Sequence, residues 1–159
     1  MFKVGDKVVY PAHGVGVIED IQNREMLGTK ESFYILHMCE RDMTIMVPTA
    51  NSNKVGLREV IAEGDVTKVL DVLKQRGSKT TEAWNRRSKQ YMETIKTGCV
   101  FEIAKIYRDL TQLKRRKTLS FGEKRVLDNV RELIAEEISQ VRGISKDSVV
   151  ILLDNFVAQ

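Results

Sequence analysis

The sequence predicts an α+β protein of two domains, a small N-terminal β-barrel followed by a compact bundle of about five helices. Two observations predict this division. Before residue 60, short apolar runs are broken by turn residues, which is typical of strands. After residue 60, apolar residues recur three and four positions apart, as they do on helices. We place the first domain in residues 1–56 and the helical domain in residues 64–159, with Gly56 and Gly64 as candidate hinges.

The N-terminal region contains four or five short candidate strands. Turn residues at positions 11–14 separate the first candidate strand from the second, and Gly28 lies in the turn that follows the second. So many strands within about 60 residues predict a barrel, because closure removes the exposed edges of a sheet. The candidate strands lie at residues 7–10, 15–21, 33–38, 43–47 and 57–61.

Five apolar runs with helical spacing follow, within residues 66–73, 84–95, 100–113, 126–138 and 149–156. The glycines at positions 77, 98 and 143 are predicted to end three of these helices, since glycine favours the C-terminal cap. Ser120 and Glu123 have the spacing of a capping box, and Thr80 or Thr81 is predicted to cap the second helix. Short loops between such helices are typical of a compact bundle.

Charge is distributed unevenly along the chain, whose net charge is +4. Residues 1–60 contain 7 Lys and Arg against 8 Asp and Glu, whereas residues 61–159 contain 19 against 14. The basic excess therefore lies in the helical region and favours a polyanionic partner there. The densest run, residues 114–117, ends the third predicted helix, where the helix dipole also favours cations.

The sequence lacks the motifs of the common enzyme classes. It contains no P-loop, no GxGxxG pattern, no HExxH and no nucleophile elbow. Cys39 and Cys99 match no CxxC pattern, and His13 and His37 have no cysteine cluster beside them. We therefore expect a protein that is not an enzyme and that needs no metal and no cofactor.

Two further properties indicate the compartment. No segment approaches the roughly 20 consecutive apolar residues of a membrane span. The two distant cysteines are most simply reduced thiols. We expect a cytoplasmic protein without membrane contact, and nothing in the sequence requires a state other than a monomer.

The most informative segment is W-N-R-R-S-K at residues 84–89, which contains the only tryptophan. A flat ring beside three cations is suited to nucleic acid, since the cations can neutralise phosphates while the ring stacks or wedges at a base step. Alternatively Trp84 fills a core, because tryptophan is highly buried on average. Its place in the first turn of a helix favours exposure, but the pattern alone leaves both interpretations open.

Other residues near this segment are candidates for the same surface. Cations at a helix start gain nothing from the helix dipole, which favours a functional reason for Arg86 and Arg87. Met92 lies eight residues after Trp84, and Phe121 directly follows a predicted helix cap. Together they would form an apolar patch rimmed by arginine, and such patches are typical of binding sites.

Five segments carry a family resemblance: residues 2–11 with 13–14, 55–60, 84–87, 96–98 with 108–110, and 119–125. They read F-K-V-G-D-K-V-V-Y-P with H-G, V-G-L-R-E-V, W-N-R-R, K-T-G with R-D-L, and L-S-F-G-E-K-R. Together they resemble the CarD/CdnL family of bacterial RNA polymerase-binding transcription regulators over nearly the whole chain. Residues 1–60 are also similar, more loosely, to the polymerase-interacting domain of the transcription–repair coupling factor. That similarity implies a Tudor or SH3-like barrel.

The resemblance implies that the barrel binds the β subunit of RNA polymerase. Arg24 matches a family arginine that contacts polymerase, and Met46 and Pro48 match a second contact segment. The mycobacterial branch has an arginine where Met46 stands, so this chain follows the CdnL-like branch. An apolar contact at Met46 is therefore implied in place of an ionic one.

For the helical domain, the resemblance implies contact with promoter DNA at the upstream edge of the melted bubble. Trp84 matches the family tryptophan that acts as a minor-groove wedge, and Arg86, Arg87 and Lys89 match residues that hold the DNA backbone. Such contacts position a protein without reading bases, so sequence specificity is expected to be weak. The implied function is stabilisation of the open promoter complex.

A second function stays open at this point. Tryptophan and arginine are also enriched at protein–protein hot spots. The helical domain would then bind another protein and not DNA. Salt dependence separates the two, because each phosphate contact contributes about −0.9 to the log–log slope of affinity against salt.

Overall fold

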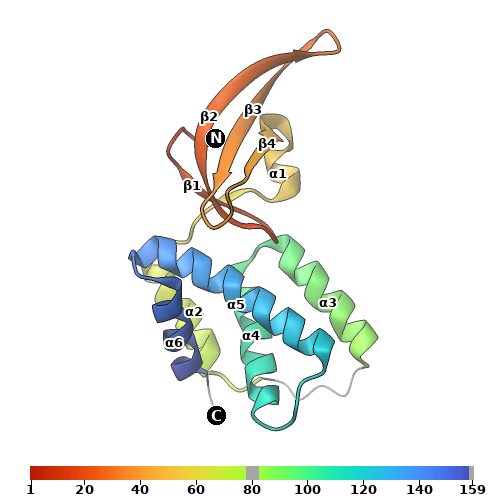
Figure 1. The fold of residues 1–159 in the computed structure, drawn as a ribbon, viewed down its shortest axis with the longest axis vertical. Coiled ribbons are helices and arrows are strands. Elements are labelled where there is room, and N and C mark those ends of the chain that lie inside the picture. The colour runs from red at the N-terminus through yellow and green to blue at the C-terminus, as the bar shows by residue number, and fades with distance from the viewer. Residues whose placement is uncertain (78–82, 158–159) are drawn as a thin grey trace. The chain divides into compact units, whose positions relative to one another are not determined.

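The computed structural model describes residues 1–77 and 83–157 (Figure 1). The chain separates into two compact units, Met1–Val60 and Ile61–Gln159. The first unit is built on an antiparallel sheet and the second from helices, which confirms the α+β class with two domains. Thr80 and Thr81, predicted as helix caps, lie outside the described residues.

The first unit contains a five-stranded antiparallel sheet in the order β4-β3-β2-β1-β5. A 3₁₀ turn (Thr49–Asn51) packs against β3, and the short helix α1 (Ser52–Val55) follows it. A register shift between Ile18 and Asp20 marks a bulge, which increases the twist of β2. The strands are β1 (Lys7–Tyr10), β2 (Gly14–Met26), β3 (Thr29–Met38), β4 (Thr44–Pro48) and β5 (Arg58–Glu59).

The core of this unit lies on one face of the curled sheet. Val8 of β1, Ile18 of β2, Leu36 of β3 and Val47 of β4 are all at most 2% exposed. Leu57, which follows α1, completes this cluster. Because successive side chains on a strand alternate between faces, the residues between these core positions form the opposite face.

The β2–β3 hairpin is longer than the sequence predicted (Figure 1). The pattern placed strands at residues 15–21 and 33–38, but the ladder continues to the pair Met26 and Thr29. Residues 22–25 are polar, and most of them are exposed. They therefore show no alternation of apolar and polar side chains, and their strand structure rests on backbone pairing and on a polar contact across the ladder, from the Ser32 hydroxyl to Asn23 Oδ1.

The second unit contains five helices among its described residues, as predicted. Helix α4 packs against both α2 and α5, α5 packs against α6, and α3 packs against α4 and α5. Gly98 and Gly143 cap α3 and α5 with φ of 72° and 65°, the left-handed conformation predicted for such positions. The helices are α2 (Glu63–Lys74), α3 (Trp84–Thr97), α4 (Val100–Lys114), α5 (Phe121–Arg142) and α6 (Lys146–Phe156).

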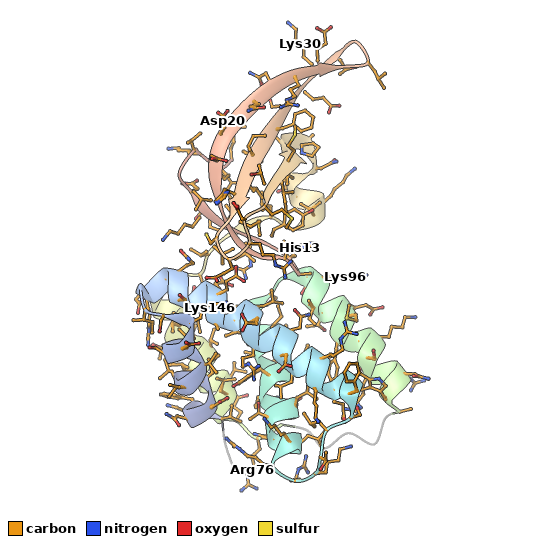
Figure 2. All side chains as sticks on the ribbon, viewed as in Figure 1. His13, Asp20, Lys30, Arg76, Lys96 and Lys146 are labelled. Carbon is orange, nitrogen blue, oxygen red and sulfur yellow. The ribbon has the colours of Figure 1, made fainter. Side chains whose placement is uncertain are left out.

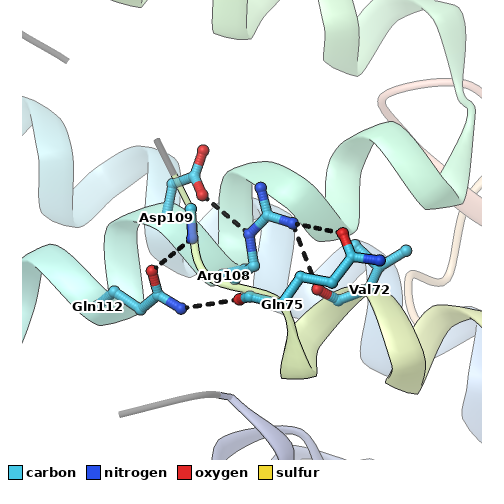
Figure 3. A network of polar contacts seen from close by, with 6 residues as sticks. Val72, Gln75, Arg108, Asp109 and Gln112 are labelled. Atoms are coloured by element: carbon cyan, nitrogen blue, oxygen red, sulfur yellow. Dashed lines mark hydrogen bonds and ion pairs between the residues drawn. The ribbon is translucent and has the colours of Figure 1, made fainter. Parts of the chain in front are cut away.

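Helix α2 ends at Lys74, earlier than the predicted stop at Gly77. The cause is a polar network from α4 (Figure 3). Arg108 donates from its Nη1 to the Val72 carbonyl at 3.3 Å, and Gln112 donates to the Gln75 carbonyl at 3.1 Å. These bonds add partners for the carbonyls at the helix end, where the Val72 carbonyl also accepts from the Gln75 N–H at 3.2 Å, and the chain leaves the helix there.

The same network fixes the segment that follows α2. The Gly77 N–H donates to Gln112 Oε1 at 2.9 Å, and a Cβ at Gly77 would collide with the Asp109 carboxylate. That carboxylate accepts a hydrogen bond from the nearly buried Arg108 at 2.9 Å. Gly77 is therefore needed for close approach to α4.

The hairpin turn yields a stability prediction. Leu27 and Gly28 have φ of 52° and 78°, as a type I′ turn requires, and Leu27 is fully exposed. A non-glycine residue in this conformation costs about 1–2 kcal/mol, and asparagine tolerates it best. Leu27→Asn should therefore slow amide hydrogen exchange across the hairpin about five-fold, equivalent to about 1 kcal/mol.

Leu27→Ala is the matched control, because alanine removes the exposed side chain but keeps the Cβ penalty. Equal protection of the hairpin amides in the two variants would show that backbone strain at Leu27 is negligible.

Candidate nucleic-acid interface

Trp84 is the first residue of α3 and is half-buried. Ala83 precedes it as the N-cap residue and makes no side-chain cap. On α3, the Tyr91 ring lies 6.2 Å from the Trp84 ring, centroid to centroid, with the planes tilted by 58°. Trp84 is thus neither a fully buried core residue nor a free surface ring, and part of the indole stays accessible.

Helix α5 forms the other wall of the Trp84 site. A Cβ at Gly122 would lie 2.7 Å from Trp84 Cζ2 and 3.0 Å from Nε1, so only glycine allows the ring to approach this closely. Gly122 occupies the second position of α5. The indole therefore packs on the backbone of the first turn of α5.

Arg87 joins the two helices through a buried ion pair. Its Nη2 lies 3.1 Å from Glu123 Oε2, and the two side chains are only 12% and 2% exposed. The guanidinium carbon lies 5.3 Å from the centre of the Trp84 ring, within the range of a cation–π contact. Burial alone would lower the Arg87 pKa, but hydrogen bonds with Tyr91 and Glu123 outweigh it and raise the pKa.

Glu123 also caps its own helix. Its Oε1 accepts a hydrogen bond from the Ser120 N–H at 2.9 Å, and the Ser120 hydroxyl accepts one from the Glu123 N–H at 3.2 Å. This is the predicted capping box, now confirmed in both directions. Burial opposes ionisation of Glu123, but bonds from Ser120 and Arg87, together with the Lys117 charge, lower its pKa overall.

The predicted site residues fall into two groups. Arg86 and Lys89 are exposed, as are Met92 at 46% and Phe121 at 76%. Arg87 instead lies beneath the surface, paired with Glu123. Phe121, Arg86 and Lys89 thus lie exposed in the first two turns of α5 and α3, whereas Met92 lies about two turns further along α3.

Sequence reasoning missed several residues of this site. Glu123 was identified only as a helix cap, and Gly122 only as part of a family segment. Arg125, whose guanidinium lies 5.8 Å from the Phe121 ring, was not singled out. The pair of Arg87 and Glu123 spans 36 positions, and no local sequence pattern could have indicated it.

In the N-terminal unit, Arg24, Met46 and Pro48 lie on the same face of the sheet. In the sheet, Gln22 of β2 lies opposite Phe33 of β3, and Phe33 lies opposite Pro48 of β4. Met46 lies opposite Ile35, which is two residues from Phe33 on β3, so Met46 is on the same face. Arg24 is two residues from Gln22 on β2, and therefore points to the same face. The fold thus places Arg24 of β2 on the same face as Met46 and Pro48 of β4, which are distant from it in sequence.

This face is polar along β2 and apolar along β4. Arg24 donates to Gln22 Oε1 at 2.9 Å, and Gln22 donates to Asp20 Oδ2 at 3.1 Å. Met46 is 40% exposed at the edge strand. Figure 2 shows charged side chains along the hairpin from Asp20 to Lys30. The surface can therefore offer both ionic and apolar contacts to a protein partner.

Within residues 1–77 and 83–157, no group of three or more His, Cys, Asp or Glu side chains could hold a metal ion. In the same part of the chain, every helix is too short or too polar to cross a membrane.

Comparisons with known proteins cover both units. The CarD-like/TRCF RID domain matches residues 2–61, and the CarD C-terminal domain matches residues 68–154. A protein of Bacillus subtilis (strain 168), named "Putative transcription factor YdeB", is 34% identical over 149 residues, which cover 94% of this chain and 97% of that protein.

Two solved structures from Myxococcus xanthus are similar to part of the chain. CdnLNt is 48% identical with a TM-score of 0.35, and covers 40% of this chain and 89% of its own. The 72-residue N-terminal domain of CarD is 34% identical with a TM-score of 0.33, and covers 37% of this chain and 79% of its own.

The close approach at Gly122 is testable with the single tryptophan. In Gly122→Ala the new Cβ should displace the indole, which gives red-shifted emission and stronger acrylamide quenching. Helix propensity favours alanine by about 1 kcal/mol, so α5 itself should not weaken. Gly64→Ala in α2 is the control, because a Cβ there meets nothing within 4 Å. The same emission from both variants would contradict the predicted packing.

The buried carboxylate predicts a pH dependence of stability. The folded pKa of Glu123 lies below its ordinary value of 4.5, so its contribution is present above pH 4.5 and is lost as the pH falls through the folded pKa. Glu123→Gln should lower the free energy of unfolding by about 2 kcal/mol at neutral pH and should flatten its acid dependence.

Denaturant unfolding followed by circular dichroism between pH 3 and pH 7 measures both effects. Glu132→Gln is the control, because Glu132 is exposed and its pair with Lys146 is expected to contribute about 1 kcal/mol or less. A Glu123→Gln variant with unchanged acid dependence would show that this carboxylate is not held ionised in the fold.

Proposed function

Because the chain belongs to the CarD family of transcription regulators, we propose that it binds the RNA polymerase β subunit and stabilises the open promoter complex. The N-terminal unit supplies the polymerase contact, and the helical unit contacts promoter DNA at the upstream edge of the bubble. One monomer acts on each polymerase. It acts by binding, without a catalytic residue, metal or cofactor.

The observation that carries this proposal is the half-exposed indole of Trp84 between two helix N-termini. Arg87 and the backbone at Gly122 hold the ring, and the neighbouring cations Arg86 and Lys89 are exposed. An indole fixed in this way can enter a base step with little loss of side-chain entropy on binding. A wedge at the edge of the bubble opposes re-stacking and so slows its collapse.

The cations around Trp84 have different roles. Arg86 and Lys89 are exposed in the first two turns of α3, where they can neutralise phosphates of DNA that reaches this helix end. Arg87 is 12% exposed on its side chain, and we assign it mainly to positioning the indole, with at most its outer edge available to DNA. Phosphate contacts carry no sequence information, so the polymerase must supply the location.

The common face of Arg24, Met46 and Pro48 supports the polymerase contact. Arg24 can form an ionic contact at the hairpin, and Met46 can form an apolar one on the edge strand. Tethering through this face raises the effective concentration of the helical unit at the promoter. A DNA contact that is weak in isolation is then sufficient.

The test is the lifetime of the open complex after heparin challenge. Trp84→Ala should shorten it by on the order of tenfold, since stacking on an aromatic ring is worth about 1–3 kcal/mol per base. Ile151→Ala, which removes an exposed apolar side chain from α6, is the matched control.

Arg24→Glu should weaken binding to the β subunit and leave binding to free DNA unchanged.

The exposed Phe121 ring supports one other function, an adaptor that binds a second protein. An unchanged lifetime in Trp84→Ala, with polymerase still bound, would reject the wedge and favour that adaptor. Loss of both polymerase and DNA binding in Arg24→Glu would contradict the division of roles between the units.

A further inference from the structure

The chain passes from the first unit to the second at the peptide between Val60 and Ile61. On the side of the first unit, β5 pairs with β1 as far as Glu59, and the Val60 N–H donates to the Lys7 carbonyl at 3.4 Å. On the side of the second unit, the Ile61 N–H donates to Glu137 Oε2 of α5 at 2.8 Å. Two consecutive residues are therefore anchored, each in its own unit, and no free residue separates them.

Glu137 is suited to hold its end of this connection. It is 3% exposed, so water competes little for its contact with Ile61. A bond from a backbone N–H to a carboxylate is charge-assisted, and such bonds are roughly twice as strong as neutral ones. Ala62, the N-cap residue of α2, makes no side-chain cap, and α5 supplies the polar contact beside it instead. The dipole of α2 also favours a carboxylate near this helix start.

The two glycines that the sequence offers as candidate hinges do not lengthen the connection. Gly56 is the C-cap of α1, with φ of 77°, and its N–H donates to the Asn53 carbonyl at 3.2 Å. Gly64 is the second residue of α2. Each glycine is held within the hydrogen-bonded structure of one unit. Because the peptide itself is planar, the rotatable bonds left at the junction are ψ of Val60 and φ of Ile61.

We propose that Glu137 is a positioning residue, which confines the connection between the units to a single pivot. The units can then reorient about this peptide, but the connection gains no length. The inference rests on the proposed function, in which the polymerase-bound unit delivers Trp84 to the promoter. A short connection keeps the effective concentration of the indole high, because that concentration falls roughly as the −3/2 power of linker length or more steeply.

Amide hydrogen exchange at Ile61 in the full chain tests the contact directly. Glu137→Met removes the acceptor and should speed exchange at Ile61 by about tenfold or more, whereas Glu137→Gln keeps an oxygen acceptor and should retain most of the protection. Glu132→Met is the matched control, because Glu132 is exposed on the same helix. Equal exchange at Ile61 in the wild-type chain and in Glu137→Met would show that Glu137 does not hold the junction, and the proposal would be wrong.

The lifetime of the open complex tests the consequence. Inserting Gly-Ser-Gly-Ser between Val60 and Ile61 keeps both anchors but lengthens the connection from about two residues to about six, which should shorten the lifetime up to about five-fold. Glu137→Met frees the chain as far as Glu63 and should shorten the lifetime about three-fold, and Glu137→Gln should restore it. Binding to the β subunit and to free DNA should stay unchanged in all three variants, because each unit keeps its own surface.

An unchanged lifetime in the insertion variant, while Trp84→Ala still shortens it, would overturn the proposal and leave the proposed function standing. If neither the insertion nor Trp84→Ala changes the lifetime, both are wrong, even where Glu137 is found to protect the Ile61 amide. If Glu137→Met loses binding to free DNA, Glu137 supports the helical unit as a whole, and the positioning role assigned to it is wrong.

Discussion

The buried ion pair between Arg87 and Glu123 is the interaction on which the helical unit's candidate site depends. It joins the first turns of α3 and α5, places a guanidinium against the Trp84 ring, and shares its carboxylate with the capping box of α5. Each charge is taken from water, so each needs the other. Removing one partner of such a buried pair destabilises the fold, because the remaining charge is left uncompensated. The position of the indole and the start of α5 are therefore coupled.

In the proposed function, this coupling would make a small DNA contact effective. A flexible tryptophan would lose rotamer freedom on entering a base step, whereas this ring is already confined by Tyr91, Arg87 and the backbone at Gly122. The exposed cations nearby supply attraction without specificity. In the same proposal the N-terminal unit has a separate task, because a face that carries Arg24 and Met46 is suited to a protein contact that would bring Trp84 to the promoter.

Much of the fold was predictable from local sequence. The capping box of Ser120 and Glu123 and the glycine caps at 98 and 143 were confirmed, because each depends on residues that are neighbours in the chain. The extension of the β2–β3 hairpin was missed, since its polar residues show no alternation. The early end of α2 depends on Arg108 and Gln112 of another helix, and the Arg87–Glu123 pair joins distant segments. Such long-range polar contacts leave no periodic signal in the sequence.

The sharpest measurement is a double-mutant cycle between Arg87→Met and Glu123→Gln, with the open-complex lifetime as the readout. If Arg87 acts by holding Trp84 through Glu123, either single variant should shorten the lifetime of the open complex. The double variant should then give the same lifetime as the single variants. If Arg87 instead acts on DNA independently of Glu123, the two effects should multiply. Multiplicative effects would contradict the positioning role of the buried pair.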